Sequence, residues 1–145
     1  MSDVQEARVE LVDGMHFAGY GFPGGDEASV HLDAAEDFGG RGLGDRPQSL
    51  LLVSLCGCTA MDVLSILRKK REAVSGLEVR ARASRADDHP RVYTSIHLTY
   101  VVSGQDIAPA SIERAIELSL DRYCPVAALL KQVVPIDTSY EIVPA

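Results

Sequence analysis

The chain has three cysteines, Cys56, Cys58 and Cys124, and their thiols are its most reactive side chains. Three cysteines are too few for a scaffold of disulfide bonds. In a reducing cytosol a pair of thiols is more often catalytic, redox-active or metal-binding than structural. A single cysteine is equally often a small, buried and inert core residue. The positions of the three cysteines therefore decide which of them carry chemistry.

Two of the cysteines lie in an apolar run that begins at Leu50 and is long enough to form a helix. In a helix, Asp62 lies on the same face as Cys58, one turn later. Cys56 points elsewhere, because two residues correspond to about 200° around a helix. A Cys56–Cys58 disulfide or a shared metal would require a break at Gly57. Helix geometry therefore favours Cys56 as a small core residue.

The third cysteine lies at an expected junction between two helices. Cys124 precedes Pro125, and the residue before a proline is displaced from the helical region. Pro125 suits the first position of a new helix, so Cys124 is expected at its N-cap. Backbone N–H groups and the helix dipole favour a thiolate there. The position indicates redox chemistry, and the alternative is a cysteine that fills a corner between two helices.

Other kinds of site have little support in the sequence. The histidines show neither HxH nor HExxH spacing and no CxxC motif is present, so we expect no metal site. Serine and aspartate residues occur without the nucleophile elbow of a hydrolase. The glycine-rich loop at 33–46 lacks the pattern of a phosphate-binding loop. The four histidines are His16, His31, His89 and His97.

Composition narrows the class of protein further. The chain has 145 residues, with 14 Lys and Arg against 21 Asp and Glu, a net charge of −7. This acidic balance disfavours a nucleic-acid partner, because phosphates need basic neighbours. The uncharged stretch 47–61 is shorter than the ~20 apolar residues of a membrane span, and charges interrupt the first fifteen residues where a secretory signal would be apolar. We expect one cytoplasmic domain with no membrane partner.

The elements that must position the cysteines follow from periodicity and turn residues. We expect N-terminal strands within 4–32, and a central helix over 47–72 that is apolar on every side over 50–61. A helix without a polar face should be enclosed by protein. A hairpin over 76–102, helices over 109–134 and a last strand at 140–143 complete the chain. This order indicates an α+β fold.

These motifs resemble the OsmC/Ohr family, the osmotically inducible and organic-hydroperoxide-resistance proteins, and most of all its OsmC-like branch. The resemblance rests on CTAMDV at 58–63, ILRKKR at 66–71 and YCPV at 123–126, and it extends over nearly the whole chain. It implies antiparallel sheets wrapped around a long buried central helix. It also implies an intertwined homodimer with its active sites at the subunit interface.

The same resemblance implies a bacterial antioxidant enzyme, a thiol-dependent peroxidase of peroxiredoxin type. Cys58 matches the peroxidatic cysteine and Cys124 the resolving cysteine. A thiolate attacks the peroxide O–O bond to give a sulfenic acid, and the second thiol traps it as a disulfide. The implied partners are a small-molecule hydroperoxide and an external dithiol reductant. No cofactor is required.

The sequence departs from the Ohr pattern at the residues that polarise the reactive thiol. Ohr proteins have an N-terminal arginine and a glutamate early in the central helix. Here Met15 and His16 stand near the first position, and Gln48 stands at the second. We expect Gln48 and Met61 as binding residues, and this departure supports an alternative, a non-catalytic small-ligand-binding or stress-response protein. The arginines considered as substitutes are Arg41, Arg46 and Arg122.

Overall fold

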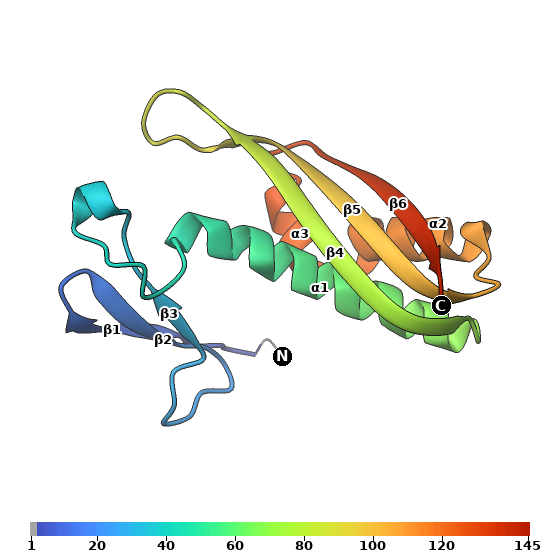
Figure 1. Cartoon of the computed structure of the whole chain (residues 1–145), viewed down its shortest axis with the longest axis horizontal. Coiled ribbons are helices and arrows are strands. Elements are labelled where there is room, and N and C mark those ends of the chain that lie inside the picture. Colours follow the sequence, from blue (N-terminus) through green and yellow to red (C-terminus); the bar gives the residue numbers. More distant parts are fainter. Residues whose placement is uncertain (1–2) are drawn as a thin grey trace. The chain divides into compact units, whose positions relative to one another are not determined.

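The computed structural model describes residues 3–145, and its elements are shown in Figure 1. The chain divides into two compact units, one ending at Leu51 and the other running Leu52–Ala145. The long helix α1 (Pro47–Lys69) contains the boundary between them. It is continuous through Gly57, so the break that a Cys56–Cys58 disulfide would need does not occur, and both thiols are free.

The first unit is a three-stranded antiparallel sheet, as the N-terminal pattern predicted. Its strands are β1 (Arg8–Asp13), β2 (His16–Tyr20) and β3 (Val30–Leu32), in that order. Gly14 turns β1 into β2 with a φ of 57°, a conformation that glycine adopts without steric cost. A short 3₁₀ helix, η1 (Glu36–Phe38), follows in the glycine-rich loop.

A buried carboxylate organises that glycine-rich loop. Asp33 is 2% exposed and accepts three backbone N–H groups: those of Ala34 at 2.8 Å, Arg41 at 2.9 Å and Leu43 at 3.0 Å. The N–H groups of Arg41 and Leu43 are the main causes that hold the pKa of Asp33 below its usual value. The loop N–H groups therefore surround an internal anion.

The second unit combines a three-stranded sheet with helices. Its strands are β4 (Ala73–Arg85), β5 (Tyr93–Gln105) and β6 (Ile136–Pro144), in that order. Between β5 and β6 the chain forms α2 (Pro109–Leu118), a π-helical turn η2 (Ser119–Tyr123) and α3 (Pro125–Leu130). The predicted hairpin and helices are present, with β4 and β5 three residues longer at their outer ends and β6 longer than the predicted 140–143.

The sheet of the second unit is mixed, which corrects the expectation that it is antiparallel throughout. β4 pairs antiparallel with β5, but β6 pairs parallel with β5, from Ile96 opposite Ile136 to Gly104 opposite Pro144. A two-residue turn joins only antiparallel strands, whereas a helical crossover returns the chain to the same end of the sheet. The α2–α3 segment is this crossover.

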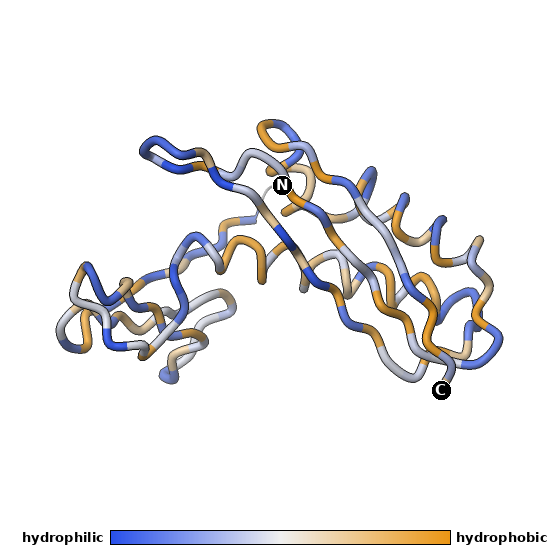
Figure 2. Tube along the Cα trace, turned by 45° about the horizontal axis from the view of Figure 1, so that its top comes forward, coloured by the Kyte–Doolittle hydropathy of each residue, from blue (hydrophilic) through white to orange (hydrophobic). Residues whose placement is uncertain are grey.

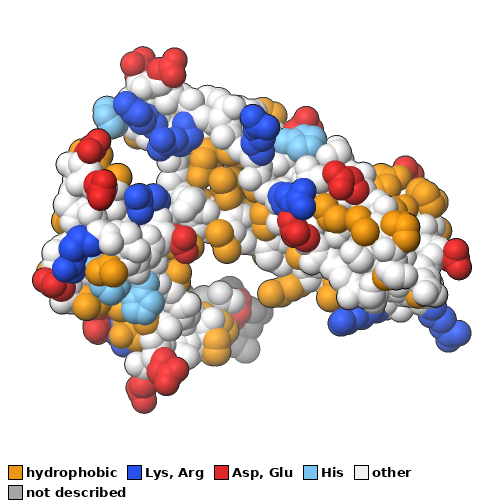
Figure 3. All heavy atoms as spheres, viewed as in Figure 1, with side chains coloured by type: hydrophobic (Ala, Val, Ile, Leu, Met, Phe, Trp, Pro, Cys, Tyr) orange, Lys and Arg blue, Asp and Glu red, His pale blue; other side chains and the backbone are white. Residues whose placement is uncertain are grey.

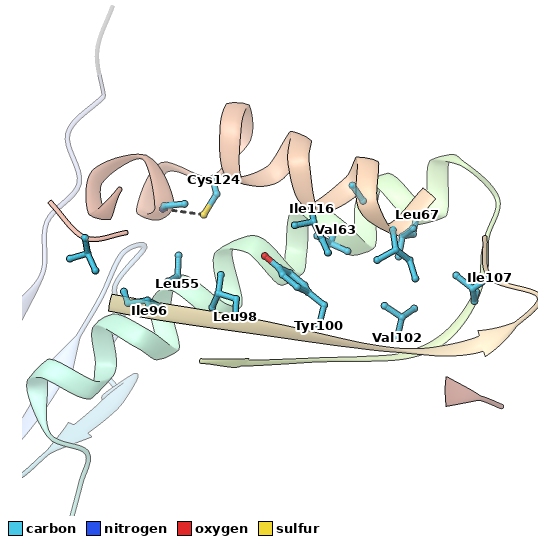
Figure 4. Close-up of a cluster of buried hydrophobic side chains, with 14 residues drawn as sticks. Leu55, Val63, Leu67, Ile96, Leu98, Tyr100, Val102, Ile107, Ile116 and Cys124 are labelled. Atoms are coloured by element: carbon cyan, nitrogen blue, oxygen red, sulfur yellow. Dashed lines mark hydrogen bonds between the residues drawn. The ribbon is translucent and has the colours of Figure 1, made fainter. Parts of the chain in front are cut away.

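The core lies between one face of this sheet and the helices (Figure 4). Alternate residues of β5 point toward α1 and α2, because successive strand side chains point to opposite faces. Figure 2 shows hydrophobic and hydrophilic residues alternating along the strands and helices. The fully or nearly fully buried residues include Leu55, Val63 and Leu67 of α1; Ile96, Leu98, Tyr100 and Val102 of β5; and Ile112, Ala115 and Ile116 of α2.

Only one face of α1 is buried within the chain, and the expectation that protein encloses the helix on every side depends on a second copy. Its buried residues are four apart and form a single stripe: Leu55, Thr59, Val63 and Leu67. Val53 is 60% exposed and Met61 is 74% exposed, and Figure 3 shows apolar side chains at the visible surface. By length and composition alone α1 also matches a membrane span, a test that the core helix of a soluble protein also passes.

Candidate functional site around two cysteines

Two of the three cysteines meet in the second unit. Cys58 lies in the middle of α1 and is half-buried, packed against the core cluster. Cys124, between η2 and α3, is 2% exposed. The Cys58 side chain is near enough to Cys124 to be one of the causes that raise the pKa of the Cys124 thiol. The fold therefore brings together the two thiols that the sequence motifs singled out.

Cys124 is the N-cap of α3, as Pro125 predicted. Its backbone is extended, with φ −80° and ψ 106°, and its Sγ accepts the N–H of Ala127 at 3.3 Å (Figure 4). Its own N–H donates to the carbonyl oxygen of Ser119 at 2.8 Å and closes the π-helical turn. Both sides of Cys124 are thus held by backbone hydrogen bonds.

The environment of Cys124 keeps its thiol protonated, contrary to the expectation that the N-cap would favour a thiolate. Burial and the nearby Cys58 side chain raise the pKa of Cys124 to about 11. The Ala127 N–H lowers it, but with a smaller effect. α3 has only six residues, so few aligned peptide dipoles oppose the cost of burying a charge.

A chain of buried polar side chains runs beside the cysteines, and sequence reasoning did not single it out. The hydroxyl of Tyr100 lies 2.8 Å from Thr59 Oγ1, which lies 2.8 Å from Ser119 Oγ. Ser119 in turn donates to Asp62 Oδ2 at 2.9 Å. The available signal was Thr59, a polar residue inside an apolar run, next to Cys58.

Burial is also the main cause of the raised pKa values of Tyr100 and Cys56, which lie near the cysteine pair. Burial is the largest cause that raises the pKa of Tyr100 to about 12, so its hydroxyl remains protonated at neutral pH. Cys56 is half-buried against the core, and burial raises the pKa of its thiol. Cys56 is therefore the small core residue that helix geometry predicted.

The residues predicted to bind substrate lie at other places on α1. Gln48 is in its first turn, within the unit that ends at Leu51. Met61 lines an open groove of about 290 Å³ with Ala60, Leu64 and Arg68 of α1 and residues 74–77 of β4. This groove is apolar with one guanidinium group. The hydrogen bonds of the buried polar chain join Tyr100, Thr59, Ser119 and Asp62.

Two of the candidate arginines have partners of their own. The guanidinium of Arg41 pairs with Asp13 at 3.1 Å, within the first unit. That of Arg122 lies over the ring of Tyr123, 5.6 Å from its centroid. These contacts give neither arginine a role at the thiols.

Three of the four histidines, His16, His31 and His97, form hydrogen bonds across neighbouring strands. His97 bonds Asp137 at 2.9 Å and Ser139 at 2.8 Å, the distances of a Ser-His-Asp arrangement. All three lie on the solvent side of the sheet, where water competes for each bond and the charges are screened. His16 bonds His31 at 2.9 Å in the first sheet. In residues 3–145, no three His, Cys, Asp or Glu side chains gather as a metal site.

Similar proteins place the chain in a family. Residues 40–139 match the OsmC-like protein family. Protein YhfA of Escherichia coli K12 is 37% identical over 140 residues, which are 97% of this chain and 99% of YhfA. The crystal structure of a hypothetical protein from Aquifex aeolicus VF5 is similar at 29% identity, with a TM-score of 0.84 and 99% of each chain covered.

A more distant likeness extends to proteins with named stress roles. The organic hydroperoxide resistance protein OhrB of Bacillus subtilis shares the fold at 13% identity, with a TM-score of 0.63 over 96% of this chain and 98% of OhrB. The resemblance drawn from the two cysteine motifs is confirmed by these comparisons. The chain belongs to the OsmC-like protein family.

Proposed function

We propose that this protein reduces organic hydroperoxides, with Cys58 as the peroxidatic thiol and Cys124 as the resolving thiol. The observation that carries the proposal is the contact between the half-buried Cys58 and the buried Cys124. The fold shared with OhrB of Bacillus subtilis, named for organic hydroperoxide resistance, supports the choice of substrate class.

The reaction proceeds in two steps at the pair. The Cys58 thiolate attacks one peroxide oxygen, so an S–O bond forms, the O–O bond breaks, and the alcohol leaves after taking a proton. The Cys124 sulfur then attacks the Cys58 sulfenic acid. An S–S bond forms, the S–O bond breaks, and water leaves with the proton of Cys124. An external dithiol reduces the disulfide by exchange and is itself oxidised.

The unequal environments of the two thiols fit unequal roles. Cys124 is buried, with a pKa of about 11, so it is a weak nucleophile toward a peroxide in solution. Cys58 is more accessible, and its neighbour can react only after Cys58 has become an electrophilic sulfenic acid. This order prevents both thiols from being oxidised independently.

A peroxide-consumption assay with dithiothreitol tests the proposal. Wild type should consume an organic hydroperoxide catalytically, Cys58→Ser should lose that activity, and Cys124→Ser should accumulate the Cys58 sulfenic acid. Cys56→Ser is the matched control on the same helix and should retain the wild-type rate. Equal rates in wild type and Cys58→Ser would refute the enzymatic function.

A second candidate function is the binding of a small apolar ligand. The groove lined by Met61 favours it, because its walls are apolar and Arg68 offers one charged group. So does Gln48, which stands where Ohr proteins have a glutamate. This function predicts saturable binding of an apolar carboxylate without peroxide consumption, and Met61→Asp should abolish that binding.

We also propose a cytoplasmic homodimer in which a second copy covers the exposed face of α1. The face includes Val53 and Met61, and leaving it in water is unfavourable. The resemblance to an intertwined family supports a second copy as the occupant. Cell fractionation tests the localisation, and recovery of the protein with membranes would contradict it.

A further inference from the structure

The buried hydroxyl groups beside the cysteines have a fixed donor direction. Each hydroxyl has one proton to donate, and a carboxylate only accepts. Ser119 donates its proton to Asp62, so Ser119 must accept from Thr59. Thr59 has then used its own proton and must accept from Tyr100. The carboxylate of Asp62 thereby orders the whole chain of hydroxyls.

Ser119 connects this chain to Cys124. Its hydroxyl is held by Thr59 and Asp62, both on α1, and its carbonyl oxygen accepts the Cys124 N–H at 2.8 Å. The bond to Cys124 closes the π-helical turn η2, a feature frequently found at functional sites. Cys58 directly precedes Thr59 in α1. The hydroxyl chain thus joins the segment that carries one thiol to the helix that carries the other.

Burial makes this connection hard to replace. Tyr100, Thr59 and Ser119 have no exposed surface. Bulk water does not reach these three hydroxyl groups, so the loss of an acceptor is costly. Apolar side chains of the same shape would fill this space equally well. The space instead holds four polar side chains from α1, β5 and η2, which are those of Tyr100, Thr59, Ser119 and Asp62.

We propose that Asp62 is a positioning residue for disulfide formation between Cys58 and Cys124, acting through Ser119 on the backbone of Cys124. The proposal rests on the proposed function for its choice of the reacting pair. By holding Ser119 and through it the backbone of Cys124, Asp62 raises the effective concentration of the Cys124 sulfur at Cys58. A neutral acceptor at position 62 should preserve this effect, and an apolar side chain should not.

The test measures the Cys58–Cys124 disulfide in a buffer of reduced and oxidised glutathione. Two protein thiols and one oxidised glutathione give the disulfide and two reduced glutathiones, so the equilibrium reports the effective concentration directly. We expect Asp62→Leu and Ser119→Ala to lower it about tenfold, the worth of one hydrogen bond. Asp62→Asn should stay within about threefold of wild type, because its amide oxygen accepts from Ser119.

Two further variants separate positioning from general damage. Ser65→Ala, an exposed serine on the same helix, should match wild type. The double variant Asp62→Leu with Ser119→Ala should lower the effective concentration no further than either single change, because both changes break the same hydrogen bond. Circular dichroism checks that each variant folds, and Ser119→Ala, which removes one oxygen atom, keeps the test available if Asp62→Leu does not fold.

A trapping experiment distinguishes failure of this inference from failure of the proposed function. After one equivalent of cumene hydroperoxide, Ser119→Ala should form the Cys58 sulfenic acid at the wild-type rate, yet hold it long enough for dimedone to trap. Wild type that forms neither the Cys58 sulfenic acid nor the Cys58–Cys124 disulfide after this treatment would refute the peroxidase, while the glutathione equilibrium would still test positioning. A folded Ser119→Ala with the wild-type equilibrium, or Asp62→Asn as impaired as Ser119→Ala, would overturn the positioning role.

Discussion

At the scale of single residues, burial raises the pKa of the Cys124 thiol and thereby links the stability of the fold to pH. The pKa of Cys124 is raised from 9.0 to about 11, chiefly by burial. A raised pKa stabilises the fold fully below the unfolded value, and this contribution is lost as the pH rises through the folded value. We therefore expect denaturant unfolding to become easier between pH 9 and pH 11.

Cys124→Ser, compared over the same pH range, identifies the thiol as the cause. A serine hydroxyl does not titrate there, so the variant should lose less stability between pH 9 and pH 11 than wild type. Identical slopes in the two proteins would assign the alkaline loss to other groups, such as Tyr100 with its pKa of about 12.

A second expectation at this scale concerns Thr59, the middle of the buried hydroxyl chain. Thr59→Val keeps the shape but leaves the Tyr100 hydroxyl without its acceptor, at a cost of about 1–3 kcal/mol. Tyr100→Phe removes the first hydroxyl of the hydrogen-bonded series and leaves no donor unpaired. It should therefore lower the free energy of unfolding by about 1 kcal/mol or less. Urea unfolding of both variants measures the difference. A more damaging Tyr100→Phe would contradict the assigned donor direction.

At the scale of elements, the loop after β3 depends on the charge of Asp33. The N–H groups of Arg41 and Leu43 hold the pKa of Asp33 below 3.8. A lowered pKa stabilises the folded loop above the unfolded value, and this contribution is lost as the pH falls through the folded value. We expect the Arg41 and Leu43 amides to lose protection from hydrogen exchange below about pH 3.8.

Asp33→Asn should produce the same loss at neutral pH. Ala34 donates to one carboxylate oxygen, while Arg41 and Leu43 donate to the other. An amide has one accepting oxygen, so either orientation sets an NH₂ group against a backbone donor. Asp37→Asn, an exposed change in η1, is the control, and equal protection in the two variants would contradict a central role for Asp33.

At the scale of the whole molecule, the exposed apolar face of α1 governs assembly. Light scattering at low micromolar concentration should give the mass of two chains for the proposed homodimer. Val53→Asp together with Met61→Asp should dissociate it, because a charge buried without a partner is strongly unfavourable. Leu129→Asp places the same charge at an exposed leucine of α3 and should leave the dimer intact. A folded wild-type monomer would refute the proposal.

Local patterns in the sequence determined the elements and singled out the two cysteines that the fold brings together. Pro125 predicted that the helix would break and that Cys124 would cap the next one, because a proline constrains its immediate neighbours. Apolar periodicity predicted a helix continuous through Gly57, which separates Cys56 from Cys58. Together with the motifs at 58–63 and 123–126 these features identified the family.

Only the tertiary structure decided what depends on residues far apart in the chain. The bonds of Thr59 to Tyr100 and to Ser119 span 41 and 60 residues, and no local pattern encodes them. The parallel pairing of β6 follows from the path of the crossover, and the pKa of Cys124 follows from how much protein covers its sulfur. Sequence periodicity shows that a side chain is apolar or polar, while burial depends on which neighbours the folded chain brings to it.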